Sequence, residues 1–394
     1  MTESDHSHRT MSNNAQGYSS TNNLEDSLED SLVILDKLVL PEVSRPWWER
    51  AHLAKISLFI SSLYLFVVSI TLMKDGARGV APLVRGLFSV TNVGNCLGFG
   101  WLFAYTIMSG SPVAAASLTF FDAGLLDKLG AFAMITGSRL GAGFIVLFIG
   151  FIYVLRGRDR ATSLSMGVIS LTVTITTYLP GFFLGALILR AGWLDVVQLD
   201  SGALLRSIID RLVAPITEPL VNLLPNWAVF LLGLGVILLS FKLFDKCLPQ
   251  MSIKDSQLGW LSRLVYRPVV MFVLGALVTM ISMSVSLSLS ILVPLSARGF
   301  VRRENVIPYI MGANITTFID TLLAAVLLNN QPAFTIVYVG MFSISIVSLA
   351  ILFTVYPRYL RGVLGFVSWV TDTNRNLAIF MAAIFVVPIV LMLI

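Results

Sequence analysis

The sequence predicts an all-α integral membrane protein with two inverted repeats, each containing a re-entrant hairpin made of a broken helix. Its 394 residues are 56% hydrophobic and only 12% charged, with a mean hydropathy of +0.84, which is typical of a polytopic membrane protein. Long apolar runs alternate with loops that carry Lys and Arg. Two of these runs are interrupted by small, hydroxyl-rich breaks that resemble each other.

The two breaks and the motifs that follow them recur at one common offset along the chain. In the first stretch, Met108-Ser109-Gly110-Ser111 is followed by Gly137-Ser138-Arg139-Leu140-Gly141. In the second, Met283-Ser284-Val285-Ser286 is followed by Gly312-Ala313-Asn314-Ile315-Thr316. A broken helix leaves backbone N–H and C=O groups unpaired, so it survives in hydrocarbon only where protein or a watery cavity satisfies them. Paired broken segments therefore indicate the binding site of an inverted-repeat transporter.

The apolar runs give a division into five parts. These are a polar cytoplasmic tail, disordered or amphipathic (1–45), membrane repeat 1 (46–189), a mixed-charge connector (190–225), membrane repeat 2 (226–357), and a C-terminal loop with the last transmembrane helix (358–394). In the tail, leucines from Leu24 to Leu38 have helical spacing, which predicts a short amphipathic helix with a surface-lying or regulatory role. No signal-peptide pattern is present, which favours an inner or plasma membrane.

Seven apolar runs are long enough to cross a bilayer core of about 30 Å, five without a charge and two with one charge each, Arg139 and Asp320. They are Ile56–Met73, Leu129–Leu155 (one charge), Ala161–Leu189, Pro219–Phe241, two spans in Asn305–Pro357 that separate at Asn329–Pro332, and Asn376–Ile394. The broken runs Gly86–Phe121 and Pro268–Ala297 are interpreted as hairpins that return to the side from which they start. The hairpins then enter from opposite sides, which inverts the second repeat relative to the first.

Basic loops set the predicted orientation, because cytoplasmic loops are enriched in Lys and Arg. Four basic loops then lie inside, at 156–160, 242–267, 298–303 and 358–375, so the N-terminus is cytoplasmic and the C-terminus is outside. Three basic residues contradict the rule by lying outside: Lys74, Arg78 and Arg85.

Several function classes receive no support from the residues. The only cysteines are Cys96 and Cys247, and all three histidines precede the first apolar run, so neither a disulfide framework nor a Cys- or His-based metal site is indicated. We find no nucleotide-binding glycine loop and no nucleophile with its base, so we expect no enzyme activity. The net charge of +5 is small and scattered, which gives no reason to expect a nucleic-acid partner.

The hydroxyls at the breaks are candidate ligands. Half-helix N-termini suit an anion, whereas free carbonyls and hydroxyls suit a small cation such as sodium. The second break offers a serine at every other position from Ser282 to Ser290. Alternate positions do not share one helix face, so several of them must point elsewhere, and a single serine more often packs between membrane helices.

Arg139 and Asp320 are charges inside apolar runs, where they are costly and should face the protein interior, a cavity or each other. Each sits within or just after the glycine-led break of its own repeat, so we expect an ion pair between them. Three interpretations stay open: a structural pair that links the repeats, Arg139 as a direct oxyanion ligand, and Asp320 as a cation or proton site. Asp122, at the end of a predicted hairpin, is expected to be solvated.

The motifs resemble those of the type II sodium/phosphate cotransporter family, whose two inverted repeats each carry a Q-S-S-S tip followed by G-A-N-I-G-T-T. The resemblance covers about Leu63–Leu155 and Leu232–Pro357. Its strongest points are Leu72–Gly76, Asp122–Leu126, Gly275–Thr279, Leu292–Leu295 and Gly312–Ile315. It implies a secondary carrier with inverted repeats.

This sequence departs from the family pattern at several positions. Met108 and Met283 occupy the glutamine positions of the two tips, and Arg139 occupies the asparagine position that Asn314 keeps in the second repeat. The two threonine positions of the first repeat are Ala142 and Gly143. Sodium-coordinating hydroxyls are therefore depleted there. The Arg139 guanidinium could hold an oxyanion in its planar fork, or it could replace a sodium ion by a tethered positive charge.

The resemblance implies alternating-access transport of phosphate or a similar inorganic anion, coupled to sodium, with no resident cofactor. The expected substrate-binding residues are Ser109, Ser111, Arg139, Ser284, Ser286 and Asn314, and those expected to hold sodium are Ser284, Asn314, Thr316, Thr317 and Asp320. Two alternatives are a transport-inactive homologue that acts as a membrane scaffold or sensor through its N-terminal tail, and a carrier of another substrate with proton coupling through Asp320. Expected partners are the lipid bilayer, the anion and sodium or a proton; a homo-oligomer stays open.

Overall fold

The structure is a computed structural model that describes residues 53–87, 92–157, 160–197, 199, 202–247, 267–290, 292 and 302–394. The chain divides between Ala54 and Lys55, and the description below concerns the unit Lys55–Ile394. The predicted tail (1–45) with its amphipathic helix lies outside the described residues, as do parts of three of the basic loops. Within the described ranges, every regular element is helical, as the sequence predicts.

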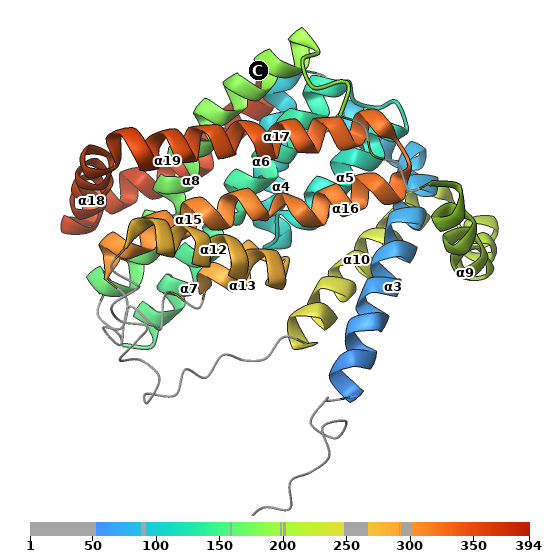
Figure 1. Cartoon of the computed structure of the whole chain (residues 1–394), viewed down its shortest axis with the longest axis horizontal. Helices are drawn as coiled ribbons and strands as arrows, with labels where there is room; N and C mark the ends of the chain where they lie inside the picture. Colours follow the sequence, from blue (N-terminus) through green and yellow to red (C-terminus); the bar gives the residue numbers. More distant parts are fainter. Residues whose placement is uncertain are drawn as a thin grey trace, which may run out of the picture. The chain divides into compact units, whose positions relative to one another are not determined.

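The helices follow the predicted order of apolar runs (Figure 1). They are α3 (Leu53–Gly76), α4 (Val93–Ile107), α5 (Ser111–Asp122), α6 (Lys128–Ala142), α7 (Phe144–Leu155), α8 (Arg160–Ala191), α9 (Gly202–Leu223), α10 (Asn226–Cys247), α12 (Pro268–Ser282), α13 (Val285–Ser290), α15 (Arg303–Thr316), α16 (Phe318–Leu328), α17 (Gln331–Ala350), α18 (Tyr356–Asp372) and α19 (Asn374–Leu393). In the described part, seven segments are long and apolar enough to cross a membrane. Each overlaps one predicted crossing.

Both predicted breaks interrupt a helix in the same way. α4 ends at Met108 and α12 ends at Met283, and both methionines adopt left-handed backbone conformations, with φ of 57° and 48°. A left-handed conformation is unfavourable for a residue with a side chain. Among the described non-glycine residues only Asn329 shares a positive φ, and it caps α16 where the sequence predicts the next boundary. The backbone therefore breaks at equivalent positions of the two stretches.

After the first break the chain turns back on itself. Ser117 of α5 donates to the carbonyl oxygen of Ala131, early in α6, at 2.9 Å, whereas Ser111 at the start of α5 contacts Arg139, late in α6, at 3.2 Å. α5 therefore runs antiparallel to α6. A Cβ added to Gly130 would lie 3.1 Å from Cys96 Sγ, and one added to Gly141 would lie 2.5 Å from the Trp101 carbonyl oxygen, so α4 runs parallel to α6.

The helix that precedes each break packs backbone to backbone on a later helix, α4 on α6 and α12 on α15. This contact is made by two glycines in each half, and a methyl group on any of them would overlap a backbone carbonyl oxygen of the facing helix. The approaches are Gly100 to Met134, Gly137 to Leu97, Gly275 to Tyr309, and Gly312 to Phe272. The four glycines and the four residues that they face are related by the same offset that separates Met108 from Met283. The similarity between the two stretches of sequence is therefore also found in individual helix contacts.

The two long segments that follow the breaks, Lys128–Leu155 and Arg303–Leu328, run in opposite directions. Asn330, just after α16, donates to Asp122 Oδ1, just before α6, at 2.8 Å. Arg139, which comes after Asp122 in the chain, contacts Asp320, which comes before Asn330, at 2.8 Å. The two segments are therefore antiparallel at this contact. Figure 1 shows α15 and α16 lying end to end, interrupted at Thr317.

Two connecting segments contain helices that the sequence analysis does not predict. The predicted connector contains α9, in which Pro215 and Pro219 are accommodated, and the predicted C-terminal loop contains α18, which buries Val363, Val367 and Val370. These valines have helical spacing, but Arg358 and Arg361 precede them and Asp372 follows them, so the uncharged run that contains them is short. A search for uncharged runs therefore passes over this amphipathic helix.

Asp122 is not the freely solvated carboxylate that the sequence predicts. Its Oδ2 lies 3.4 Å from Lys74 Nζ, which also donates to the carbonyl oxygen of Leu328 at 3.2 Å. Arg85 donates to the carbonyl oxygens of Gly124 and Leu125, at 2.9 and 3.0 Å. Two of the three basic residues that contradict the predicted orientation are thus engaged by protein groups, which weakens their influence on orientation. The orientation itself stays a prediction.

Candidate functional site

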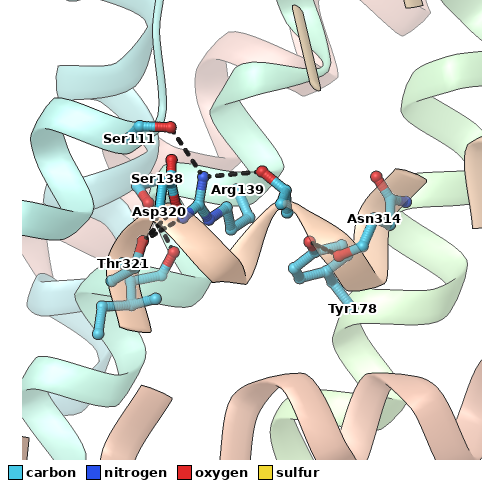
Figure 2. Close-up of polar contacts among 9 residues, drawn as sticks. Ser111, Ser138, Arg139, Tyr178, Asn314, Asp320 and Thr321 are labelled. Atoms are coloured by element: carbon cyan, nitrogen blue, oxygen red, sulfur yellow. Dashed lines mark hydrogen bonds and ion pairs between the residues drawn. The ribbon is translucent and has the colours of Figure 1, made fainter. Parts of the chain in front are cut away.

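A cluster of polar side chains surrounds Arg139 on α6, where both halves of the molecule meet (Figure 2). Arg139 is buried, with 3% of its surface exposed. Its Nη1 donates to Ser111 Oγ at 3.2 Å and to Thr317 Oγ1 at 3.0 Å. Ser111 belongs to the first broken element, whereas Thr317 belongs to the second half of the molecule. One guanidinium nitrogen thus bridges the two halves.

The second guanidinium nitrogen makes the predicted ion pair. Arg139 Nη2 lies 2.8 Å from Asp320 Oδ1 and also donates to Thr321 Oγ1. Thr321 in turn donates to Asp320 Oδ1 at 2.8 Å. The Asp320 side chain is 1% exposed, so both charges are desolvated. Because such a pair must offset the cost of desolvation by good geometry, removing one partner is far more damaging than removing both.

Local sequence explains how these groups converge. Gly137 and Gly141 lie on the side of α6 that touches α4. Thr317, Asp320 and Thr321 stand three and four positions apart across the start of α16, so they share one helix face. The Phe318 ring also lies beside the guanidinium. Its centroid is 5.3 Å from Arg139 Cζ, which is within reach of a cation–π interaction.

Two polar atoms of the cluster have no partner within the described part of the chain. They are Arg139 Nε and Asp320 Oδ2, both buried. The carboxylate therefore meets the guanidinium through one oxygen rather than in the two-pronged arrangement that arginine often makes with a carboxylate. Buried polar atoms without partners are uncommon and call for an explanation.

Asn314 and Thr316, both expected ligands, point to other helices. Asn314 Nδ2 donates to Thr174 Oγ1 of α8 at 3.2 Å, and the Asn314 carbonyl oxygen accepts from Tyr178 Oη at 2.8 Å. Figure 2 shows Asn314 and Tyr178 together, apart from the Asp320 end of the guanidinium. Thr316 Oγ1 donates to the Ala276 carbonyl oxygen of α12 at 2.8 Å.

Hydroxyl groups form a network of hydrogen bonds among the described residues of the second break. Thr279 donates to Ser288 Oγ at 2.8 Å, and Ser288 shares a 2.8 Å hydrogen bond with Tyr309 Oη. The backbone N–H of Ser284 donates to Ser282 Oγ at 3.4 Å. Ser286 lies in α13, and its side chain is outside the description. This break therefore contains neutral donors and acceptors, whereas the first break faces a charge.

The structure brings together four of the expected site residues: Ser111, Arg139, Thr317 and Asp320. Ser109 and Ser284 lie partly buried at the two breaks. Sequence reasoning missed Thr321, Thr174, Tyr178, Ser288 as a network member, and Tyr309. Thr321 had a usable signal, because it follows Asp320 directly and stands four positions after Thr317. The contacts of Thr174 and Tyr178 cross between distant segments, for which a single sequence gives no signal.

Apolar cavities in the described part of the chain include three whose lining residues lie outside the Arg139 cluster. Two of them measure about 400 and 380 Å³ and lie against α18 and α10, respectively; the third, of about 50 Å³, includes Met283. Nor do the described residues place three or more His, Cys, Asp or Glu side chains together. The two charged side chains of the cluster, Arg139 and Asp320, are buried in this conformation.

Comparison with known proteins adds one match. Residues 236–368 match the family model described as Na+/Pi-cotransporter, and this match supports membership of that family. The matched residues contain the second break, Asn314, Thr317 and Asp320. No curated protein and no solved structure matches the chain.

Proposed function

We propose that this chain, as its membership of the Na+/Pi-cotransporter family suggests, is a secondary carrier that moves phosphate or a similar inorganic oxyanion. Transport is driven by a sodium gradient and proceeds by alternating access. The observation that carries the proposal is the pair of breaks with left-handed methionines at Met108 and Met283. The second of these lies within the family-matched residues.

Inverted repeats with re-entrant hairpins are the architecture that we propose for transport. Support comes from the four glycine approaches at one offset and from the opposite directions of Lys128–Leu155 and Arg303–Leu328. α4 and α12 have 15 residues each. At 1.5 Å per residue each is about 22 Å long, shorter than a bilayer core of about 30 Å. Each break then lies inside the membrane rather than at its surface.

We place the anion between the two breaks. α5 begins at Ser111, beside Arg139, and its first turn adds backbone N–H groups and the partial positive charge of a helix N-terminus. Ser109 and Ser284 stand at the two breaks, so hydroxyls approach from both halves. The proposed substrate-binding set is Ser109, Ser111, Arg139, Ser284, Ser286 and Asn314.

Sodium is assigned to oxygen atoms of the second half: Ser284, Asn314, Thr316, Thr317 and Asp320. Thr317 and Asp320 are engaged by Arg139 in this conformation, and Thr316 is engaged by α12. Ser284 and Asn314 are therefore the members of the set to examine first for sodium coupling. The Arg139 cluster joins both halves. Movement of one half relative to the other must therefore change the contacts of this cluster or those of the residues around it.

Uptake of labelled phosphate into proteoliposomes tests the proposal. We expect an inward sodium gradient to raise uptake several-fold over an equal choline gradient. Ser284→Ala should reduce uptake, whereas Ser240→Ala, which removes a hydrogen bond to Ser62 between α10 and α3, should leave it intact. Absence of phosphate, arsenate and sulfate uptake by well-folded protein under every cation gradient would contradict the proposed function.

A further inference from the structure

Oxygen atoms surround the Arg139 guanidinium in the way that ligands surround a metal ion. One is a carboxylate oxygen and three are hydroxyl oxygens, with the Phe318 ring 5.3 Å from Arg139 Cζ. Oxygen donors of this kind, with one negative charge among them, suit a hard cation. The four oxygens are Ser111 Oγ, Thr317 Oγ1, Asp320 Oδ1 and Thr321 Oγ1.

The contact between the two charges is not bidentate. Arginine frequently meets a carboxylate through two parallel hydrogen bonds. Here Asp320 contributes one oxygen, while its other oxygen and Arg139 Nε stay without partners in the described part of the chain. Each terminal nitrogen instead joins two oxygens, so the guanidinium lies at the centre of the oxygens.

The equivalent position in the other half lacks a charge. Asn314 stands at the common offset from Arg139, and its side chain donates to Thr174 on α8. The charge is therefore an addition confined to the first half, whereas three of the four oxygens that surround it belong to the second half. One counter-charge, Asp320, balances it.

We infer that the Arg139 guanidinium is a built-in cation that fills, between the two halves of the molecule, the place of a free monovalent cation. The guanidinium occupies this place in the folded chain, whether or not the protein transports a substrate. The consequence for transport rests on the proposed function. Of the residues assigned to sodium there, Thr317 and Asp320 are then occupied by the guanidinium, so the carrier couples to one cation fewer than its oxygen ligands would otherwise hold. Removal of the guanidinium should open this place to a cation from solution.

Thermal unfolding of the purified full-length protein tests the inference directly. Wild type, Arg139→Ala and Arg139→Ala/Asp320→Asn are compared in choline, sodium and methylguanidinium chlorides at equal millimolar ionic strength. We expect methylguanidinium, and sodium in addition, to raise the unfolding temperature of Arg139→Ala saturably by about 5 °C or more over choline, as ligand binding to the folded state requires. Methylguanidinium should leave the wild type unchanged, and the double variant should lose the response.

Lys74→Ala is the matched control. It also removes the cation of an ion pair, but the Lys74 and Asp122 side chains are 43% and 17% exposed. Water can therefore solvate the remaining carboxylate, and no cation-specific rise is expected. An equal rise in Lys74→Ala and Arg139→Ala would show a general salt effect and overturn the inference.

Arg139→Lys covers the case in which Arg139→Ala does not fold. A lysine ammonium is a compact point charge, so a place for a cation should accept it, with an unfolding temperature close to that of the wild type. If Arg139→Lys is as unstable as Arg139→Ala and no cation restores either, the cluster requires the guanidinium shape and the inference fails. If wild type shows no phosphate uptake while the methylguanidinium response is present, the proposed function fails and the built-in cation stands.

Discussion

The two breaks share a backbone and differ in the side chains around them. Both place a left-handed methionine after an apolar helix, Met108 in the first half and Met283 in the second. The first break adjoins a buried charge pair, through the hydrogen bond between Ser111 and Arg139. The second adjoins a network of hydroxyls that ends at Tyr309. The two halves therefore share a backbone conformation at the break, whereas the polar and charged side chains around the break differ between them.

This difference has an energetic consequence. A substitution that disturbs the backbone contact between two helices should lower the free energy of unfolding by the same amount in both halves, because the facing atoms are the same. The polar groups should respond unequally, because a buried unpaired charge costs several times more than a lost neutral hydrogen bond. Variants that separate the two kinds of contact can therefore break or sharpen the comparison.

The largest effect is expected at Arg139. Arg139→Ala leaves the Asp320 carboxylate buried without its counter-charge, which should lower the free energy of unfolding by about 3–5 kcal/mol in the absence of a rescuing cation. Arg139→Ala/Asp320→Asn should recover most of this loss. Thermal or denaturant unfolding in choline chloride measures both. An additive loss in the double variant would contradict a direct coupling of the two charges.

The glycine contacts should give the next largest effect, with equal size in the two halves. Gly137→Ala and Gly312→Ala each place a methyl group against a backbone carbonyl oxygen, of Leu97 and Phe272, respectively. Forced separation of packed helices costs about 1–3 kcal/mol. Unfolding temperatures of both variants measure it, with Gly362→Ala as the control, since open space surrounds that position. A large loss in one half alone would contradict the structural equivalence.

Much of this scaffold could be predicted from the sequence. The apolar runs, the breaks at Met108 and Met283 and the boundary at Asn329 follow from composition, glycine and proline positions, and the common offset. α18 could not be found in the same way, because its buried valines lie in a short uncharged run bounded by Arg361 and Asp372. Burial of a single face is visible to a helical-period search but not to a search for uncharged length.

The site was predictable only in part. The ion pair between Arg139 and Asp320 follows from the cost of two intramembrane charges, which need each other. The roles of Thr174, Tyr178 and Tyr309 depend on which helices face one another, and a single sequence does not state that. The prediction that Asp122 is solvated failed for the same reason, because its partners Lys74 and Asn330 lie far away in the chain.

A smaller and again symmetric effect is expected from the left-handed methionines. Met108→Gly and Met283→Gly remove a side chain from a conformation that costs an L-residue about 1 kcal/mol, although glycine also increases the entropy of the unfolded chain. The net change in unfolding free energy should lie within about 1 kcal/mol and have the same sign at both positions. Opposite signs in matched unfolding measurements would show that one methionine has a packing role that the other lacks.

The smallest effect is expected in the hydroxyl network of the second break. Tyr309→Phe removes the hydrogen bond to Ser288, but Ser288 keeps Thr279 as a partner. A neutral hydrogen bond contributes about 0.5–1.5 kcal/mol, and the retained partner places the loss at the lower end. Thr335→Val, which removes a hydroxyl that donates to the Val197 carbonyl oxygen away from both breaks, is the control for a lost neutral bond. If Tyr309→Phe approaches the loss seen in Arg139→Ala, the second break depends on its polar network as strongly as the first depends on its charge. The contrast between a charged and a neutral half would then be wrong.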